Sequence, residues 1–291
     1  MRVLITGARG TIAGNLIRNG VLAGHEIVSV IRPGGEVPSL TSERVIYFDL
    51  TGKTGRLALS QKVDAIIHCA AITPKTAIGP ADYALNLKFA ESVCDLLASG
   101  HSTQLIFLST GSVYGTGKSL NQESTNCVPI DAYGKSILES EQIFSSLSSR
   151  NPISILRLFY PFGFDSQTKQ INMVSRLYKK ILLGEKIVIS SDAANAYFQP
   201  VLIDDVSAII AGVLKTCWTG TLNICGREKV TLRTFIDMLG TIANRTPHIV
   251  EDRMTPNVIE ADNQLLLSLG LSDEMTPLDQ AIAIAVARLS T

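Results

Sequence analysis

The sequence predicts an α/β fold in which helices cover both faces of a parallel sheet, with a smaller lobe at the C-terminal end. Two observations carry this prediction. Over about the first 160 residues, short segments that are apolar throughout alternate with amphipathic segments, as buried parallel strands and their crossover helices do. A glycine-rich turn also joins the first apolar segment to the first amphipathic one, which is typical of a doubly wound sheet.

The elements follow one another in a regular order. We predict strands at residues 3–5, 27–31, 45–48, 65–68, 105–108 and 153–158. Amphipathic periodicity predicts helices at residues 11–23, 80–99, 132–148, 167–183, 204–215, 231–243 and 277–289. This order of elements predicts a Rossmann-type sheet.

The alternation weakens after about residue 160, where prolines and glycines interrupt the chain at Pro161, Gly163, Gly184 and Pro200. We therefore expect a dinucleotide-binding domain at residues 1–160 and a smaller substrate-binding lobe at residues 161–291. The helix and strand near 198–215 are expected to return to the first domain. A ligand cleft is expected at the carboxyl ends of the strands.

Composition excludes several classes of protein. With 46% hydrophobic and 18% charged residues in 291, the chain is expected to be globular. The net charge of +0 gives no reason to expect nucleic acid as a partner, and no apolar run reaches the length of a membrane span. The five cysteines form no C-x-x-C pair and the four histidines form no ligand pattern, so we expect reduced thiols, a cytoplasmic protein and no metal. Because the first strand begins at the extreme N-terminus, we expect no N-terminal signal.

The glycine-rich turn at residues 6–14 has the chemistry of a phosphate cradle. Gly7 allows a tight turn, Gly10 lets the backbone approach a pyrophosphate, and the helix that follows offers N–H groups and the positive end of its dipole. The spacing is G-x-x-G-x-x-A, and an ordinary tight strand-to-helix turn is the alternative. We expect a cofactor to bind at Gly7, Arg9, Gly10, Thr11 and Ile12.

The end of the second strand bears on which cofactor binds. A site for NAD usually has an acidic residue there to hold the ribose 2′-hydroxyl, whereas an arginine pairs with the 2′-phosphate of NADP. This chain has Arg32 there and Arg9 in the glycine turn, with no acidic residue. The pair favours NADP over NAD, unless both are ordinary solvated surface arginines.

Two further segments complete a family pattern. Leu108-Ser109-Thr110-Gly111-Ser112-Val113-Tyr114-Gly115 ends a strand, and Asp131-Ala132-Tyr133-Gly134-Lys135-Ser136 begins a helix. Together with the glycine turn, they resemble the extended short-chain dehydrogenase/reductase family, in its nucleotide-sugar epimerase, dehydratase and ketoreductase branch. Further matches, at residues 49–50, 68–71, 155–163 and 203–206, extend the resemblance over the whole chain.

The resemblance implies roles for individual residues. Thr110 would hold the substrate oxygen while Tyr133 gives or takes a proton. Taken alone, Thr110 could be a turn residue at a strand end and Tyr133 a surface aromatic. The resemblance adds cofactor contacts at Asp49, Leu50, Ala70, Ala71, Asn86 and Tyr160. It adds substrate contacts at Thr110, Asn172, Gln199 and Arg253.

The chain departs from the family at the catalytic helix. The family's Tyr-x-x-x-Lys places a lysine four residues after the tyrosine, but this position is Ile137. Lys135 lies about 200° around the helix from Tyr133 and points away from it. Without the cation, the phenol pKa should stay near its free value of about 10. Either the chemistry is slow, or another cation substitutes, or the protein only binds its ligands.

Two other departures concern the substrate. The dehydratases of this branch have Asp-Glu after the catalytic threonine, where this chain has Gly111-Ser112, which argues against dehydration. The family often holds the substrate diphosphate with an arginine shortly before Val-Asp-Asp-Val, and the matching place here holds Tyr197-Phe198-Gln199. An arginine is the usual partner of phosphate, so its loss weakens the case for a nucleotide-diphosphate sugar, although Arg253 matches a second family arginine.

The sequence thus predicts an enzyme, either an NADP-dependent ketoreductase or an NAD-dependent epimerase, and we expect its substrate to be a nucleotide-linked sugar. The alternative is an NADP-binding module whose catalysis has decayed, and Ile137 is its best support. The resemblance also implies a homodimer built on the helices near 80–99 and 132–148.

Overall fold

The structure is a computed structural model that describes residues 1–34, 44–51, 62–98, 103–116, 120–163, 173–190, 196–252 and 259–289. The chain divides into two compact units. The first consists of Met1–Gly115, Asn126–Arg157 and Ser207–Leu222. The second consists of Thr116–Thr125, Leu158–Val206 and Asn223–Thr291.

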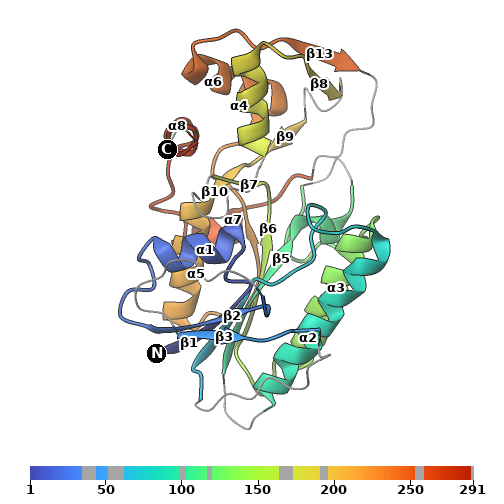
Figure 1. The fold of residues 1–291 in the computed structure, drawn as a ribbon, viewed down its shortest axis with the longest axis vertical. Coiled ribbons are helices and arrows are strands. Elements are labelled where there is room, and N and C mark those ends of the chain that lie inside the picture. Colours follow the sequence, from blue (N-terminus) through green and yellow to red (C-terminus); the bar gives the residue numbers. More distant parts are fainter. Residues whose placement is uncertain are drawn as a thin grey trace. The chain divides into compact units, whose positions relative to one another are not determined.

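A seven-stranded sheet is the framework of the first unit (Figure 1). Its strands, in spatial order, are β11 (Gly220–Ile224), β6 (Ile153–Leu158), β5 (Gln104–Thr110), β4 (Ala65–His68), β1 (Arg2–Thr6), β2 (Glu26–Ile31) and β3 (Arg44–Tyr47). The pairs β1–β2, β2–β3, β1–β4 and β4–β5 are parallel. All six predicted strands are present, and the predicted doubly wound parallel fold is confirmed.

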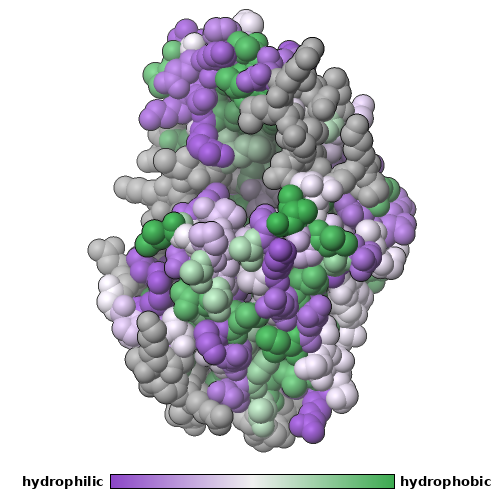
Figure 2. Space-filling model, turned by 90° about the vertical axis from the view of Figure 1, so that its right-hand side faces the viewer, coloured by the Kyte–Doolittle hydropathy of each residue, from purple (hydrophilic) through white to green (hydrophobic). Residues whose placement is uncertain are grey.

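Helices cover both faces of this sheet (Figure 1). On one face lie α1 (Thr11–Arg18) and α5 (Ile203–Thr216), joined by a hydrogen bond of 2.7 Å from Ser207 Oγ to Asn15 Oδ1. On the other lie α2 (Ala84–Leu97) and α3 (Ala132–Ser145). The 3-10 helices η1 (Pro80–Tyr83) and η2 (Gly111–Tyr114) follow the loop after β4 and the end of β5. Seen from the side of α2 and α3, hydrophobic and hydrophilic residues are interspersed (Figure 2).

The predicted helix over residues 11–23 is wrong at its C-terminal end. Helix α1 ends at Arg18 and is followed by Asn19 as its C-cap. Gly20 then takes a positive φ of 82°, a conformation that glycine adopts without the steric cost of a side chain. The apolar residues that follow therefore belong to a turn.

The second unit has its own helices and three short strand pairs. Its helices are α4 (Met173–Leu183), α6 (Leu232–Ala243), α7 (Gln264–Ser268) and α8 (Leu278–Ala287). Two strand pairs are parallel, β7 (Pro161–Phe162) with β10 (Val201–Leu202) and β8 (Ile187–Ser190) with β13 (Ile249–Asp252). The third, β9 (Tyr197–Phe198) with β12 (Val230–Thr231), is antiparallel.

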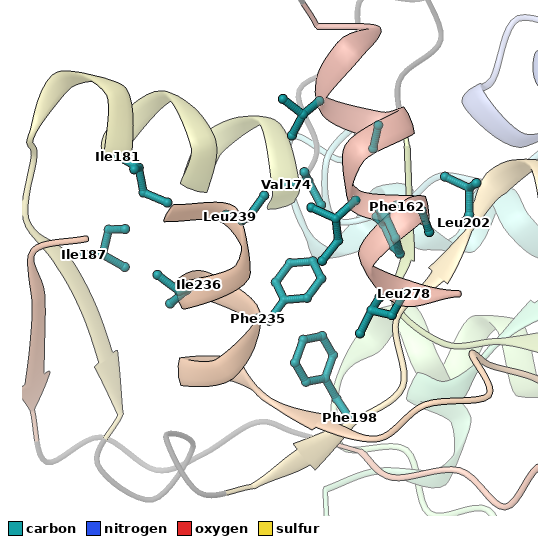
Figure 3. Close-up of a cluster of buried hydrophobic side chains, with 14 of the residues drawn as sticks. Phe162, Val174, Ile181, Ile187, Phe198, Leu202, Phe235, Ile236, Leu239 and Leu278 are labelled. Carbon is teal, nitrogen blue, oxygen red and sulfur yellow. The ribbon is translucent and has the colours of Figure 1, made fainter. Parts of the chain in front are cut away.

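Apolar side chains from α4, α6, α8 and the short strands form the core of the second unit (Figure 3). Phe235 lies at its centre, with the rings of Phe162 and Phe198 edge-on at 5.9 Å and 5.5 Å between centroids. Phe198 is therefore a core residue at the place where the family often has an arginine. Within the described residues, no helix is long and apolar enough to cross a membrane.

Candidate active site

The glycine turn has the geometry that its sequence predicts. Gly7 follows β1 with a φ of 69°, and a Cβ there would lie 2.8 Å from the backbone N and Cα of Ala70. The Gly10 N–H donates to Gly7 O at 2.7 Å, and Gly10 is the N-cap of α1. Among the described side chains, none caps this helix and its first turn holds no acid. The turn is thus pressed against the loop after β4, and α1 presents its N-terminus without an anion of its own.

A buried pair of side chains fixes the two loops that meet here. Thr6 and His68 are the last residues of β1 and β4 and lie opposite each other in the parallel pair. Thr6 Oγ1 is 2.7 Å from His68 Nδ1 and also accepts a hydrogen bond of 3.2 Å from the Ala70 N–H. Burial lowers the pKa of His68 to about 3, so the imidazole is neutral. The strand order reverses between β1 and β4, the position at which doubly wound sheets bind ligands.

Asn86 links this loop to α3. Its side chain accepts from the Ile72 N–H at 2.7 Å and donates to Ile72 O at 3.1 Å. It also donates to Ser136 Oγ at 3.0 Å, and this hydroxyl donates to Tyr133 O at 2.8 Å. Asn86 is 3% exposed, and both of its amide hydrogens are engaged inside the protein. Asn86 therefore holds the Ile72 loop against α3. A direct contact between Asn86 and the cofactor remains a prediction.

Thr110 and Tyr133 are brought together. Thr110 ends β5 and caps η2, its Oγ1 accepting from the Ser112 N–H at 3.2 Å. Tyr133 lies in the first turn of α3, and the Thr110 hydroxyl is close enough to its phenol to lower the pKa of Tyr133. Gly134 permits this approach, because a Cβ there would lie 2.7 Å from Ser112 O. Two residues that are distant in sequence thus form one polar pair at the end of β5.

The surroundings of Tyr133 keep its phenol protonated. The pKa of Tyr133 is raised to about 12, mainly by burial and in smaller part by the nearby Asp131 and Tyr83, while the Thr110 hydroxyl acts in the opposite direction. Ile137, at the place of the family lysine, is 1% exposed, whereas Lys135 is exposed on another side of the helix. No cation contributes to this pKa within the described part of the chain.

A buried ion pair supports the segment that carries Thr110. Arg157 on β6 donates to both carboxylate oxygens of Glu141 on α3, at 3.0 Å and 2.7 Å. The same carboxylate accepts a hydrogen bond from Ser109 Oγ, and Arg157 also donates to Tyr114 Oη at 2.8 Å. Burial alone would lower the pKa of Arg157, but Glu141 and Tyr114 raise it above its ordinary value. The network ties β5, η2, α3 and β6 together behind Thr110.

The remaining cofactor positions of the first unit differ in their surroundings. Arg9 and Arg32 are both exposed, and neither has a partner among the described residues. The Asp49 carboxylate accepts from the Thr51 N–H at 3.0 Å and from Thr51 Oγ1 at 2.8 Å. Leu50 is buried, and its carbonyl accepts from Ser92 Oγ of α2 at 2.9 Å. Within the described residues the two arginines thus present unpaired guanidinium groups, while Asp49 holds a turn.

The predicted residues of the second unit have a separate setting. Tyr160 has a φ of 43°, and its Oη accepts from the Ile259 N–H at 2.6 Å. Gln199 is 2% exposed, and its Oε1 accepts from the Ala261 N–H at 3.3 Å. Its Nε2 has no partner within the described residues. Asn172 and Arg253 lie outside the described residues.

The comparison with protein families decides where the chain belongs. The sequence model of the NAD dependent epimerase/dehydratase family matches residues 3–225, which include the glycine turn, Thr110 and Tyr133. The chain belongs to this family. The predicted resemblance is confirmed at this level.

Individual members of the epimerase/dehydratase family give the same picture. The chain is 26% identical to the uncharacterized UDP-glucose epimerase YtcB of Bacillus subtilis (strain 168), over 100% of this chain and 98% of that protein. The fold is similar to that of UDP-glucuronic acid 4-epimerase from Bacillus cereus in complex with UDP-glucuronic acid and NAD. In that case the TM-score is 0.83, with 21% identity over 100% of this chain and 99% of the other. The fold is also similar to that of the NDP-hexosamine 5,6-dehydratase TunA, with a TM-score of 0.81 and 19% identity over 100% of this chain and 98% of the other.

The residues of this epimerase/dehydratase family member fit a dinucleotide. Gly7 and Gly10 leave no side chain between the turn and a ligand phosphate, and the uncapped end of α1 offers backbone N–H groups to an anion. Among the described residues, no three His, Cys, Asp or Glu side chains are grouped so as to hold a metal ion. The groups available here to a dinucleotide are the backbone N–H groups of the turn and the exposed guanidinium groups of Arg9 and Arg32.

Sequence reasoning assigned no role to three residues beside Thr110 and Tyr133. Asp131 is the N-cap of α3, its Oδ1 accepting from the Gly134 N–H at 2.6 Å, and an aspartate before a predicted helix could have signalled this. Ser136 bridges Asn86 and the backbone of Tyr133. The Tyr83 ring lies 5.8 Å from that of Tyr133. Nothing in the local sequence indicates that contact, because it depends on how η1 meets α3.

A cavity of about 600 Å³ lies away from Thr110 and Tyr133. Its lining includes Ser145 at the end of α3, Ile153 at the start of β6 and Thr221 of β11. Tyr133 is at the opposite end of α3, and a helix of 14 residues is about 21 Å long. We assign this cavity no role in the chemistry.

Proposed function

We propose that the protein is an NAD(P)-dependent oxidoreductase or epimerase acting on a nucleotide-linked sugar, with Tyr133 as its acid/base. The observation that carries the proposal is the placement of Thr110 at the end of β5 beside Tyr133 in the first turn of α3, where Gly134 allows the close approach to Ser112 O. The pair is linked through Ser136 and Asn86 to the loop that packs against the glycine turn. A hydroxyl and a phenol beside a dinucleotide cradle are suited to move a proton at a sugar oxygen.

In this proposal each group has a distinct task. The nicotinamide of the cofactor supplies hydride chemistry when it is bound. Thr110 Oγ1 donates a hydrogen bond to the reacting oxygen of the sugar and holds it near Tyr133. Tyr133 Oη gives a proton to that oxygen or takes one from it. Gly7, Arg9, Gly10, Thr11 and Ile12 hold the pyrophosphate and Arg32 the ribose, while Asp49, Leu50, Ala70, Ala71, Asn86 and Tyr160 complete the cofactor site.

The relatives support a sugar linked to UDP as the substrate. The names of two of them contain UDP-glucose and UDP-glucuronic acid. Dehydration is not proposed, because Gly111 and Ser112 supply neither the acid nor the base that elimination of water requires. We expect no 4-keto-6-deoxy product from a UDP-, dTDP- or GDP-hexose. Formation of that product in excess over the protein would contradict this assignment.

For the cofactor, two lines of support have to be weighed. The exposed guanidinium groups of Arg9 and Arg32 suit the 2′-phosphate of NADP. The family description and the bound relative both name NAD. We propose that the chain binds the dinucleotide through the glycine turn and that Arg32 lets it accept the phosphorylated form.

Gln199 is the substrate contact that the structure makes easiest to test. Its buried Nε2 has no partner among the described residues, and an unsatisfied buried donor favours a ligand oxygen. In Gln199→Met, a substrate contact predicts a severalfold higher KM for the UDP-sugar with kcat nearly unchanged. Gln199→Glu is a second test variant that should raise KM in the same way, because it keeps an acceptor for the Ala261 N–H and loses only the donor. If both variants left KM unchanged, Gln199 would have no role in binding.

Other features stay proposals of the same kind. We propose substrate contacts at Asn172 and Arg253, domains divided near residue 160 with a return near 198–215, and a homodimer built on α2 and α3. Sedimentation of the purified protein tests the dimer, and a monomer at assay concentration would contradict it.

The second candidate function is a cofactor-binding module without catalysis, and Ile137 is the observation that favours it. The two functions differ in a direct assay. Oxidoreductase activity predicts turnover of NADPH with a UDP-4-keto-hexose, or epimerisation of a UDP-hexose, and loss of both in Tyr133→Phe. Tight cofactor binding without turnover of any UDP-sugar would favour the binding module.

A further inference from the structure

We propose that Glu141 and Arg157 are positioning residues of the active site, whose buried ion pair fixes the place from which Thr110 presents its hydroxyl to the substrate. This inference rests on the proposed function and adds to it two residues that do not touch the substrate. It is drawn from hydrogen bonds at both ends of the segment that carries Thr110, all within the first unit of the chain.

The first observation is that the ion pair holds this segment on both sides of Thr110. Ser109, the residue before Thr110, donates a hydrogen bond from Oγ to the Glu141 carboxylate. Tyr114 ends the 3-10 helix that Thr110 caps, and its Oη accepts from Arg157 at 2.8 Å. The Arg157 guanidinium also lies over the Tyr114 ring, 4.7 Å from its centroid. The pair therefore restrains the segment before and after the hydroxyl that the proposed chemistry needs.

The second observation is that the same pair fixes the segment against the helix that carries Tyr133. Glu141 is eight residues after Tyr133 on α3, which is about two turns and 12 Å along the helix. At the first turn, α3 already packs closely on the segment, since a Cβ on Gly134 would lie 2.7 Å from Ser112 O. Helix and segment are thus joined at two separate levels, and such a joint opposes both sliding and rotation of Thr110 relative to Tyr133.

The third observation is that a buried ion pair is a costly way to gain stability. The side chains of Arg157 and Glu141 are 8% and 4% exposed. Removing two charges from water is expensive, and replacing such a pair by apolar residues of similar volume is often neutral or stabilising. Hydrogen bonds, unlike apolar contacts, require a defined direction. We therefore assign the pair to orientation of the active site and not to stability.

The smallest change that tests this role is Ser109→Ala, which leaves the ion pair intact and frees the segment from Glu141. A displacement of about 1 Å in a positioned group can lower a rate by 10²-fold, and one lost bond of several should cost about tenfold in kcat. KM for the UDP-sugar should change little, because no binding group is removed. Ser154→Ala is the matched control: this serine is fully buried on β6, the strand of Arg157, but donates to Trp218 O. It should leave kcat unchanged.

A double variant separates orientation from stability. Glu141→Leu with Arg157→Met replaces the pair by apolar side chains of similar size, whereas either single variant would leave one buried charge without its partner. We expect the midpoint of thermal unfolding to stay the same or rise, while kcat falls by about 10²-fold and KM changes little. A pair with a merely structural role would not lower kcat in a protein of unchanged stability.

Tyr114→Phe is the second route if the double variant does not fold. It keeps the ring beneath the guanidinium and removes the hydroxyl that Arg157 holds. We expect a severalfold fall in kcat with KM and the unfolding midpoint nearly unchanged.

Hydrogen exchange of the ligand-free protein tests the positioning without any assay of activity. The Ser112 N–H donates to Thr110 Oγ1 and the Gly115 N–H to Ser112 O, both at 3.2 Å, so exchange over residues 110–115 reports local opening of this segment. In the double variant this exchange should be at least tenfold faster than in the wild type. Residues 86–97 of α2 are the internal control and should exchange as before.

The outcomes distinguish this inference from the proposed function. Unchanged kcat in Ser109→Ala, Tyr114→Phe and the double variant, with an active wild type, would overturn the inference and leave the proposed function standing. A fall in kcat that always accompanied an equal loss of stability would overturn it too, as would unchanged exchange over residues 110–115. Absence of turnover in the wild type, with cofactor bound, would overturn the proposed function and the positioning role together.

Discussion

Two helices of the first unit begin at the carboxyl side of the sheet, and their N-termini are built in opposite ways. Helix α1 begins at Gly10, and within the described residues it has no side-chain cap and no acid in its first turn. Helix α3 begins at Asp131, whose carboxylate accepts from the Gly134 N–H at 2.6 Å. One helix end lacks an anion and the other carries its own. An uncapped end attracts a ligand phosphate, whereas the capped end of α3 gives little support to a phenolate on Tyr133.

This difference indicates that the N-terminus of a helix can serve either ligand binding or proton transfer, depending on the residues in and before its first turn. At α1 the glycines keep side chains away, and the exposed Arg9 adds positive charge. At α3, burial, the Asp131 carboxylate and Tyr83 raise the pKa of the Tyr133 phenol. Changing single residues at either end should therefore affect either cofactor affinity or proton transfer, and rarely both.

The largest expected effect is at the α3 end. Tyr133→Phe keeps the ring and removes the acidic proton, and general acid–base catalysis contributes about 10²–10⁴ in rate. We expect kcat to fall by that factor, with the NADPH dissociation constant changed less than about twofold. Tyr83→Phe is the matched control, since it removes a hydroxyl from the neighbouring ring and should cost far less. Full activity of Tyr133→Phe would show that another residue moves the proton.

At the α1 end, Gly7→Ala should act on binding. A side chain at the positive φ of 69° costs about 1–2 kcal/mol, and its Cβ would lie 2.8 Å from Ala70. We expect the cofactor affinity to fall by at least tenfold in a titration of protein fluorescence. Gly20→Ala is the control, because Gly20 also has a positive φ of 82° but has no atom within 4 Å of the added Cβ. Equal losses in the two variants would mean that strain alone is responsible.

How much of this could be predicted from the sequence depends on the kind of interaction. The strands at residues 65–68 and 153–158 have the predicted bounds, because continuous apolar runs identify strands buried on both faces. Helix α1 was predicted too long, although Asn19-Gly20 is a turn signal. The strands of the second unit have two to four residues each, too few to show a period.

The candidate site divides in the same way. Thr110 and Tyr133 can be predicted from two motifs that occur in the family's order along the chain, and in the structure the two residues lie close together. The Tyr83 contact, the buried pair of Thr6 and His68 and the orphaned amide of Gln199 could not be predicted. Each depends on how separate elements pack against one another, and such packing produces no recognisable residue spacing in the sequence.

A smaller effect is expected for substitution of Arg32. It tests whether the cofactor bound at α1 carries a phosphate on its ribose. A charge-assisted hydrogen bond to phosphate contributes about 1.5–3 kcal/mol. Arg32 is exposed, so screening reduces this value and a loss of about tenfold in NADPH affinity is expected for Arg32→Asp. NADH affinity should change little, since it lacks the 2′-phosphate. Equal losses for both cofactors, measured by calorimetry, would place Arg32 away from the ribose.

The smallest expected effect separates the two uses of Asp131, as a cap and as a charge. Replacing a capping aspartate by alanine costs about 0.5–2 kcal/mol, whereas asparagine caps equally well. Asp131→Ala should therefore lower the midpoint of thermal unfolding, and Asp131→Asn should leave it nearly unchanged. Both variants remove the carboxylate, so both should lower the pKa of Tyr133, since the charge of Asp131 raises it. If the pKa fell only in Asp131→Ala, the effect would come from a loosened helix end, and the contrast between α1 and α3 would be structural and not electrostatic.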